Sequence, residues 1–568
     1  MAAERADRTC KACKGKKRRC DKELPQCGLC RRVGRLCEYD DAADSTPTVE
    51  DFAAMQTKIH DLEERLSSHQ SVFRNQTSYS SPSVSSQSYS HVDPAASLTC
   101  APPIVDRTSV ESDMSSNFPA SAFLDLDLFR WAGHSVLKPN VGIPMDVLEL
   151  LNQGNIVMDI SAQYFDTVHS WIPFISKKRM EMGISVQSGG AELALILLAM
   201  KLVISRPEDV ADESVYSLAK GFLNSLETSG LVSLMCLQAS ILIALYEYGH
   251  SIYPAAWMTV GNCARYAELL GISSSSGSSS LLSPPRTWTE VEERRRTWWA
   301  VYVLDRLISC GSKRSCAFSQ TLEKGKLPVD DDAWDSGDVA RAVNHSTSAN
   351  PVIHQSGFAM LCQAAIFTER AQASARKGQS LSPEHLKEIT DLSSEILTFL
   401  ELNDQSSNDS RQTELSFRNL TPCCVARSAL FICLEEFTCP EKIERNSGYS
   451  MSSETKEQSE IDLQAYSMQV VRQASLDICD LVSHLLDSLI EGAHPSANLG
   501  KISPFLLDGV YCALSTFHWL YGEHGDDTYL TKISTMETVL NQIGVRWWSA
   551  KRYSQLSKIY SISSRMVQ

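Results

Sequence analysis

From about residue 121 onward, apolar side chains recur at intervals of three and four, which is the period of an amphipathic helix. The strict apolar–polar alternation typical of strands is scarce in this part of the chain. Gly271 follows one such segment at a position where glycine commonly ends a helix. The pattern therefore predicts a mainly α fold. The expected helices span 191–205, 213–228, 231–248, 255–270, 290–310, 354–375, 383–402, 461–491 and 504–521.

A separate helical pattern occupies residues 49–73. Its apolar residues follow alternating spacings of three and four, the a/d seam of a coiled coil about three heptads long. With this register Lys58 is a g position and Glu63 the following e position, so two parallel copies could pair them. A single amphipathic helix packed on the rest of the chain is the open alternative, and we favour a dimerisation helix. The seam residues are Phe52, Met55, Ile59, Leu62 and Leu66.

Between residues 67 and 120 the helical spacing of apolar residues is lost. Sixteen of these residues are serine, and lysine is absent. Such a segment cannot offset its ordering entropy by burial, so 74–120 is expected to be a disordered linker. The chain is thus predicted to have four parts: a small cysteine-rich module at 8–40, the short coiled coil at 49–73, the linker at 74–120, and a large all-α body at 121–568.

The net charge of −15 over 568 residues suggests a chain that nucleic acid should repel. The distribution of charge changes that picture. Residues 8–37 hold eleven Lys/Arg and two acids, a local charge of +9, so the other 538 residues carry −24. This asymmetry is typical of a basic tip on an acidic body.

No membrane association is expected. The first residues are polar and lack the apolar core of a secretory signal. The longest apolar run, about 193–204, is interrupted by Lys201 and is too short to span a bilayer. We therefore expect a soluble intracellular protein with reduced thiols, in which clustered cysteines indicate metal before disulfides.

Six of the 18 cysteines form two copies of C-x2-C-x6-C joined by six residues. Each copy offers three thiolates, one fewer than tetrahedral zinc needs. Two ions need eight ligand places, and six cysteines fill them only if two sulfurs bridge. A single four-cysteine site would leave two cysteines idle, and an iron–sulfur site would not need the basic residues between them. The spacing predicts a cofactor of two Zn2+ held by Cys10, Cys13, Cys20, Cys27, Cys30 and Cys37.

A run of cations fills the first long spacing of this cluster. A short basic helix that enters the major groove can place lysine on guanine while neighbouring cations meet phosphates. The alternative, a nuclear-import signal, is compatible with that role. The candidate DNA-binding residues are Lys14, Lys16, Lys17, Arg18 and Arg19.

Residues 9–39 resemble the fungal Zn2Cys6 binuclear cluster DNA-binding module, whose pattern C-x2-C-R-x-R-K-x-K/R-C-D is followed by a proline loop and C-x2-C-x6-C. Asp21 and Pro25 match this pattern, whereas Lys14 and Lys16 stand where arginine is commoner.

The resemblance implies that Cys10 and Cys27 bridge. One ion would take Cys10, Cys13, Cys20 and Cys27, and the other Cys10, Cys27, Cys30 and Cys37. It also implies that Lys16 and Lys17 read CGG-type triplets, while Lys14, Arg18 and Arg19 contact phosphate.

The body resembles the fungal-specific transcription factor regulatory domain, most clearly over 160–340, in the stretches 256–272, 292–306 and 327–331. In the second stretch, Trp298, Tyr302 and the pair Asp305–Arg306 lie at helical spacing. They predict a buried Arg–Asp network against aromatic faces. Structural packing is the favoured interpretation, and a metabolite-sensing pocket is the alternative.

The chain has no GxGxxG, P-loop, GxSxG or HExxH motif, so no enzyme is expected. Just after the linker, acids alternate with bulky apolar residues, which is typical of an activation segment that folds on a coactivator. The first packed element of the body is the alternative. The apolar residues concerned are Phe123, Leu126, Leu128, Phe129 and Trp131.

Together these features predict a nuclear, sequence-specific transcription factor for RNA polymerase II genes. We expect an activator that binds double-stranded DNA as a homodimer and recruits coactivators, acting on a metabolic or secondary-metabolite gene cluster. A repressor, or a metabolite-sensing receptor that uses the same zinc module, is the competing hypothesis. The sequence gives no support for a particular small-molecule effector.

Overall fold

The computed structural model describes two stretches of the chain, with gaps. In the N-terminal segment the described residues are 6, 9–15, 20–32 and 36–38. In the body they are 118–133, 136, 138–181, 186–206, 212–272, 281–312, 314–318, 325–343, 345–347, 356–377, 382–405, 412–438, 458–491 and 499–565. The predicted coiled coil at 49–73, and the predicted linker up to residue 117, lie outside these ranges.

The described residues are helical and hold no β-strand, which confirms the mainly α fold class. One isolated antiparallel bridge joins Lys326 and Ser346. None of the described helices is both long and apolar enough to cross a membrane.

The N-terminal segment has two short helices, α1 (Lys11–Gly15) and α2 (Gly28–Arg32). The first half of the body contains α4 (Ser121–Leu124), α5 (Leu126–Trp131), α6 (Met145–Leu151), α7 (Ile156–Asp166), α8 (Lys177–Glu181), α9 (Val186–Ile204), α10 (Asp212–Thr228), α11 (Leu234–Gly249), α12 (Ala255–Leu270), α13 (Trp288–Ile308) and α14 (Asp331–Ser336). The second half contains α15 (Gly357–Arg376), α16 (Pro383–Gln405), α17 (Gln412–Thr438), α19 (Gln458–Glu491), α21 (Leu507–His524), α22 (Thr528–Ile543) and α23 (Trp548–Arg565). The 3-10 turns η1 (Val168–Ser170) and η3 (Pro504–Leu506) complete the body.

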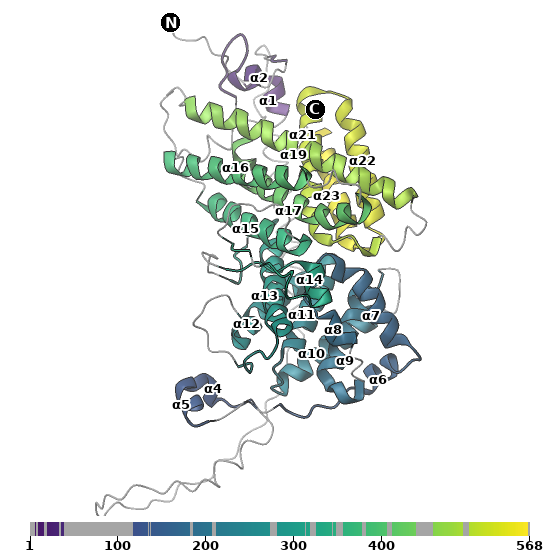
Figure 1. The fold of residues 1–568 in the computed structure, drawn as a ribbon. Coiled ribbons are helices and arrows are strands. Elements are labelled where there is room, and N and C mark those ends of the chain that lie inside the picture. The colour runs from purple at the N-terminus through teal and green to yellow at the C-terminus, as the bar shows by residue number, and fades with distance from the viewer. Residues whose placement is uncertain are drawn as a thin grey trace, which may run out of the picture. The chain divides into compact units, whose positions relative to one another are not determined.

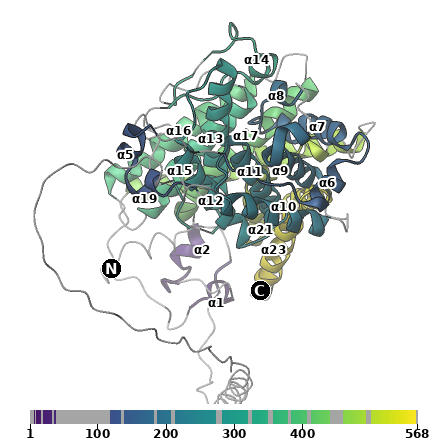
Figure 2. The ribbon, with the colours of Figure 1, turned by 90° about the horizontal axis from the view of Figure 1, so that it is seen from below.

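Two buried helices organise the core of the body. Helix α11 is buried along nearly its whole length and packs against α9, α10, α12 and α13, as Figure 2 shows. Helix α17 takes the corresponding place in the second half, between α15, α16, α19 and α21 (Figure 1). Contacts between α13 and α15 join the halves, so the apolar residues form one continuous cluster.

Several helix boundaries follow from the local sequence. Helix α12 spans the predicted 255–270, and Gly271 ends it in the left-handed conformation with φ of 66°, which confirms the predicted C-terminal glycine. Helix α11 begins at Leu234, three residues later than predicted, because the Ser233 hydroxyl accepts a hydrogen bond from the N–H of Cys236 at 3.2 Å.

Three long helices were not among those predicted: α17, α22 and α23. In α17 every residue from 420 to 434 except the half-buried Ile432 is buried, so the amphipathic period that reveals a surface helix is missing. Pro422 inside the helix further weakens the sequence signal.

The connection before α23 is fixed by two side chains. Arg546 donates to the carbonyl oxygens of Val203 and, at 2.8 Å, Ser205, and so satisfies the C-terminal end of α9. The indole N–H of Trp547 donates to the carbonyl of Ile502 at 2.7 Å. Gly249 allows this indole to pack closely, because a Cβ there would come within 2.3 Å of the Trp547 ring.

Candidate metal centre and DNA-binding module

Two equivalent half-modules hold the N-terminal cysteines. Helix α1 follows Cys10 and carries Cys13, and α2 follows Cys27 and carries Cys30. In each half the backbone N–H of the second cysteine donates to the sulfur of the first, at 3.4 Å in both cases. The repeat seen in the sequence spacing is therefore also a repeat of local geometry.

The structure brings all six cysteines together. Their sulfurs form two overlapping groups of four, and the atoms within each group lie within 4.8 Å of one another. The groups are Cys10, Cys13, Cys20 and Cys27, and Cys10, Cys27, Cys30 and Cys37.

The sulfur separations fit tetrahedral zinc. A Zn–S distance of about 2.3 Å places the sulfurs of a tetrahedron about 3.8 Å apart. The shared pair, Cys10 and Cys27, has its sulfurs 3.8 Å apart, and Cys13 and Cys30 lie 3.8 and 3.7 Å from one member of that pair. Five of the six cysteines are buried and Cys37 is half-buried, and a donor set of cysteine sulfurs is one that zinc prefers.

Burial is the largest influence on these thiols. It raises the pKa of Cys13, and it raises the pKa of Cys30 to about 11. The pKa of Cys37 is lowered despite burial, because the N–H of Cys27 donates to its sulfur at 3.3 Å. Zinc binds the thiolate form, which burial disfavours. The positive charge of the ion would therefore stabilise the thiolates in this buried cluster.

Asp21 connects the two halves. Both of its carboxylate oxygens accept the backbone N–H of Gly28, at 2.8 and 3.0 Å, at the first residue of α2. A Cβ on Gly28 would lie 2.4 Å from one of these oxygens, so only glycine fits without displacing the carboxylate. Asp21 matches the family pattern, but no role was predicted for it, and its position in the loop before α2 was the available signal.

Of the predicted DNA-binding residues, only Lys14 lies in the described part, and its side chain is exposed. Lys16, Lys17, Arg18 and Arg19 lie outside the described residues. The structure adds Arg31 and Arg32, which are exposed in α2. The repeat could have identified Arg31, because it lies 17 residues after Lys14, just as Cys27 lies 17 residues after Cys10.

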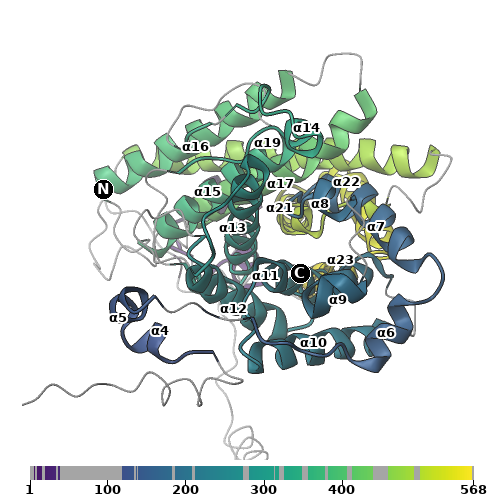
Figure 3. The same cartoon turned by 60° about the horizontal axis from the view of Figure 1, so that its bottom comes forward.

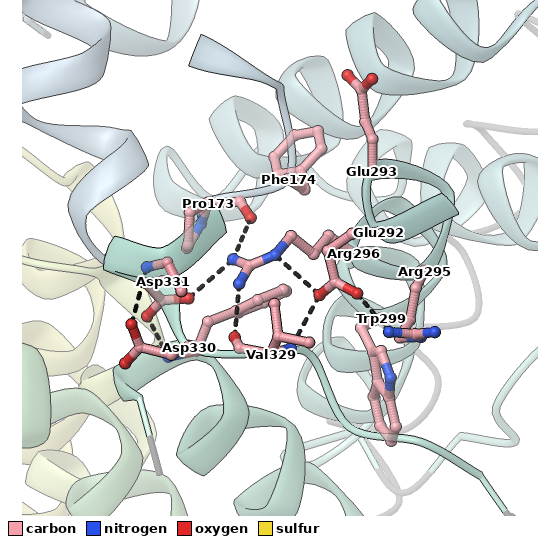
Figure 4. Close-up of polar contacts among 12 residues, drawn as sticks. Pro173, Phe174, Glu292, Glu293, Arg295, Arg296, Trp299, Val329, Asp330 and Asp331 are labelled. Carbon is pink, nitrogen blue, oxygen red and sulfur yellow. Dashed lines mark hydrogen bonds and ion pairs between the residues drawn. The ribbon is translucent and has the colours of Figure 1, made fainter. Parts of the chain in front are cut away.

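In the body, Arg296 is fully buried and links two of the family-like stretches (Figure 4). Its guanidinium also lies 4.3 Å from the centre of the Trp334 ring. Glu292 completes the network by accepting the N–H of Val329 at 2.9 Å. The guanidinium donates to Pro173 O at 3.0 Å, Val329 O at 2.7 Å, Asp331 Oδ1 at 2.8 Å and Glu292 Oε1 at 3.2 Å.

A second buried network surrounds Arg306. Its guanidinium donates to Asp305 at 2.8 Å and to Glu369 at 2.9 Å, and lies 4.5 Å from the centre of the Tyr302 ring. Burial raises the pKa of Asp305, although this carboxylate also accepts the N–H groups of Ala317 and Phe318. The predicted Arg–Asp network against aromatic faces is present, and it joins α13 to α15 and to residues 317–318.

A cleft of about 720 Å³ lies between α8, α9 and the first turns of α11 and α13. Its walls include ion pairs between Arg179 and Glu293 at 2.8 Å and between Lys138 and Glu192 at 3.0 Å. Apolar side chains including Leu234 also line it.

The structure separates the five residues of the predicted activation segment. Phe129 is buried and Leu126 is half-buried, whereas Phe123, Leu128 and Trp131 are exposed. Leu124, which was not among the five, is 84% exposed. The predicted dimerisation residues, from Phe52 to Leu66, lie outside the described residues.

Comparison with known families gives two matches. Residues 8–46 match the fungal Zn(2)-Cys(6) binuclear cluster domain, and residues 162–421 match the fungal specific transcription factor domain. The first of these domains binds two zinc ions, for which the six-cysteine cluster provides the ligands. The first match ends six residues beyond the predicted module, and the second covers the middle of the predicted body.

Three curated relatives are fungal regulators. Transcription factor BOA15 of Botryotinia fuckeliana is 35% identical over 31% of this chain and 97% of its own length. The depudecin biosynthesis cluster-specific transcription activator DEP6 of Fusarium langsethiae is 27% identical over 55% of this chain and 58% of its own length. The citrinin biosynthesis transcriptional activator mrl3 of Monascus ruber is 24% identical over 59% of this chain. The match spans 65% of mrl3, so neither of the last two relatives is covered over two thirds of its length.

Proposed function

Because the chain belongs to the fungal Zn(2)-Cys(6) binuclear cluster family of transcription factors, we propose that it is a nuclear, sequence-specific activator of RNA polymerase II genes. The observation that carries the proposal is the pair of four-sulfur groups that share Cys10 and Cys27 at zinc-like separations, within the strongly basic segment 8–37 of an acidic chain.

The zinc ions supply the folding stability that a hydrophobic core supplies in a larger domain. Among the described residues of the N-terminal segment, Leu29 is the only buried large aliphatic side chain, so burial alone supplies little stability. Cys10, Cys13, Cys20 and Cys27 hold one ion, and Cys10, Cys27, Cys30 and Cys37 hold the other. Metal binding then fixes α1 and α2, and the contact of Asp21 with Gly28 sets the connection between the half-modules.

The basic residues divide into base readers and phosphate contacts. Lys16 and Lys17 contact guanines of a CGG-type triplet in the major groove, and Lys14, Arg18 and Arg19 contact phosphate. The exposure of Lys14 at the end of α1 supports a role at the DNA surface.

The seam from Phe52 to Leu66 joins two copies, so that two modules bind two triplets. A coiled coil of about three heptads is marginal by itself and is stabilised when both modules are bound to DNA. An Ile59→Asp substitution should make the protein monomeric by sedimentation velocity and should reduce affinity for two-triplet DNA far more than for one-triplet DNA. Equal loss on both DNAs would contradict the role of the seam.

The target class follows from the relatives. Two relatives are named as activators of depudecin and citrinin biosynthesis, so we assign this chain to the control of a secondary-metabolite gene cluster. Residues 121–131 supply an activating surface that recruits coactivators. Genome-wide occupancy of the full-length protein tests this assignment, and occupancy spread over unrelated housekeeping genes would contradict it.

The central experiment measures zinc and DNA on the full chain. Purified protein should hold two zinc ions, and it should prefer CGG-containing duplex to a scrambled duplex, with affinity falling steeply as salt rises. Cys20→Ser should lose zinc and DNA binding, whereas Cys316→Ser, a half-buried cysteine of the body, should keep both. One zinc per chain, or equal affinity for both duplexes, would overturn the proposal.

A second experiment separates the cations. Lys17→Ala should relax the preference between triplets, while Arg19→Ala should weaken binding to all sequences similarly and reduce the salt slope by about one. Equal loss of preference in both variants would contradict these roles.

Metabolite sensing is the second candidate function, and the cleft beside α8 favours it. Because Lys138, Arg179 and Arg294 in its walls are paired with glutamates, a ligand there would contact the apolar side chains and Lys178. Thermal unfolding of the full chain with a library of neutral and acidic metabolites tests it, since a ligand that binds the folded state raises the melting temperature. No stabilisation by any compound would argue against sensing at this cleft.

A further inference from the structure

Helix α23 forms a basic surface on an acidic body. Helix α23 contains four Lys/Arg and no Asp or Glu, although the chain as a whole carries −15. Arg552 and Lys558 are exposed, and Lys551 lies over the Trp548 ring, with its ammonium 4.6 Å from the ring centre.

The exposed face of α23 is also apolar. Leu556 is 48% and Ile559 is 61% exposed, and both lie on the same helical face as Trp548 and Arg552, at spacings of four and three. The opposite face packs against α21 and α22, and Figure 2 shows the end of α23 extending beyond the neighbouring helices. We call the residues Trp548, Lys551, Arg552, Leu556, Lys558 and Ile559 the basic–apolar stripe.

A surface of complementary character lies at the other end of the body sequence. In α4 and α5, Phe123 is 70%, Leu124 84%, Leu128 56% and Trp131 85% exposed. The Asp127 carboxylate is exposed among them, and Asp125 caps α5 by accepting the N–H of Leu128 at 2.9 Å. Figure 3 shows α4 and α5 as a separate pair at the edge of the body. These two helices form the acidic–apolar pair.

We propose that the basic–apolar stripe of one chain docks the acidic–apolar pair of a second copy. This inference rests on the proposed dimer. The contact would cover apolar side chains that both surfaces leave in water, and would place Asp127 beside Lys558 and its neighbouring cations.

The anchors of the acidic–apolar pair favour a second copy over the same chain. Phe118 packs against Gly230, just before α11, and Lys138 pairs with Glu192 at 3.0 Å. Helix α11 then spans about 24 Å before Gly249 meets Trp547, next to α23. Figure 1 shows α4 and α5 at the opposite end of the body from α23, so the pair does not reach the stripe of its own chain while both anchors hold.

The surfaces are small compared with those of a stable dimer, which bury more than about 1,000 Å² in total. The contact therefore depends on the coiled coil, which raises the effective concentration of one surface near the other. It would also cover the candidate activating surface, so the same contact would restrain activation.

Carbodiimide cross-linking of the full-length protein tests the contact directly. An equal mixture of 15N-labelled and unlabelled chains is allowed to exchange and is then cross-linked. Mass spectrometry should find an amide between Asp127 and Lys558 that joins labelled to unlabelled peptides. Cross-links only within one chain, or none at all in a protein shown to be dimeric, overturn the proposal while leaving DNA binding intact. A protein that stays monomeric even on two-triplet DNA overturns both the proposal and the dimer.

Charge reversal supplies the matched control. Lys558→Glu and Asp127→Lys should each lower the intermolecular cross-link yield about threefold, and the double variant should restore it, because the pair is re-formed with opposite polarity. Lys387→Glu and Glu149→Lys, exposed charges elsewhere on the body, should leave the yield unchanged. Failure of the double variant to recover the yield would overturn the pairing of these two surfaces.

Discussion

The Arg296 network allows a quantitative prediction for the substitution Arg296→Met. The guanidinium has no solvent exposure and donates to two carbonyls and two carboxylates. Methionine fills similar volume but leaves Glu292 and Asp331 without this cation, and leaves the carbonyls of Pro173 and Val329 without a donor.

Breaking a buried ion pair by removing one partner costs about 3–5 kcal/mol, because the remaining charge stays buried. Arg295 still pairs with Glu292, so the lower end of that range is expected. For a body of roughly 450 residues, an unfolding entropy of about 2.1 cal/mol/K per residue converts about 3 kcal/mol into a fall of about 3 °C in melting temperature.

Thermal unfolding of the full chain, followed by tryptophan fluorescence, measures this shift. Arg295→Met is the matched control, since Arg295 binds the same carboxylate from a partly exposed position and should cost less than about 1 kcal/mol. The double variant Glu292→Leu/Arg296→Met should be less destabilised than Arg296→Met, because one stranded charge is gone. Equal shifts in melting temperature for the Arg295 and Arg296 variants would refute the argument that burial makes Arg296 the more costly of the two to remove.

Three further predictions address pH, packing and the metal module. Burial, reinforced by the nearby Arg546, lowers the pKa of His250 to about 3, below its ordinary 6.5. The unfolded chain therefore binds a proton that the folded chain does not, and stability should fall by up to about 1.4 kcal/mol per pH unit as pH drops below 6.5. Urea titrations at several pH values should show a flatter profile in His250→Gln, and an unchanged slope would contradict this assignment. Gly249→Ala should cost about 1–3 kcal/mol in urea unfolding, because Trp547 is held in place and the new methyl would overlap its ring. Gly28→Ala should weaken zinc retention against a chelator, since the methyl displaces the carboxylate that joins the half-modules, and unchanged retention would show that this contact is dispensable.

The cysteine cluster shows what a short-range sequence pattern can predict. Two C-x2-C-x6-C repeats predicted bridging sulfurs, and the structure gives two four-sulfur groups that share Cys10 and Cys27. The number of ligands and the geometry of the C-x2-C turns depend on residues close together in the chain, so the cysteine spacing alone predicts them. The contact of Asp21 with Gly28 was not predicted, because nothing in the spacing indicates which loop carboxylate turns back onto the second helix.

The helices of the body divide in the same way. Helix α12 was predicted with its glycine cap because an exposed face leaves a period in the sequence. Helix α17 was not, because neighbours on every side require apolar residues all round and erase the period. Within the predicted activation segment, only the fold separates buried Phe129 from exposed Phe123, Leu128 and Trp131.

The sequence by itself determined the fold class, the metal module and the division of charge between a basic tip and an acidic body, since each depends on residues close together in the chain. Only the tertiary structure decided what Arg296 binds, which apolar residues stay in water, and where the cations of α23 lie. These depend on contacts between segments far apart in the sequence, and their free energy comes from burial and desolvation that exist only once the helices have packed.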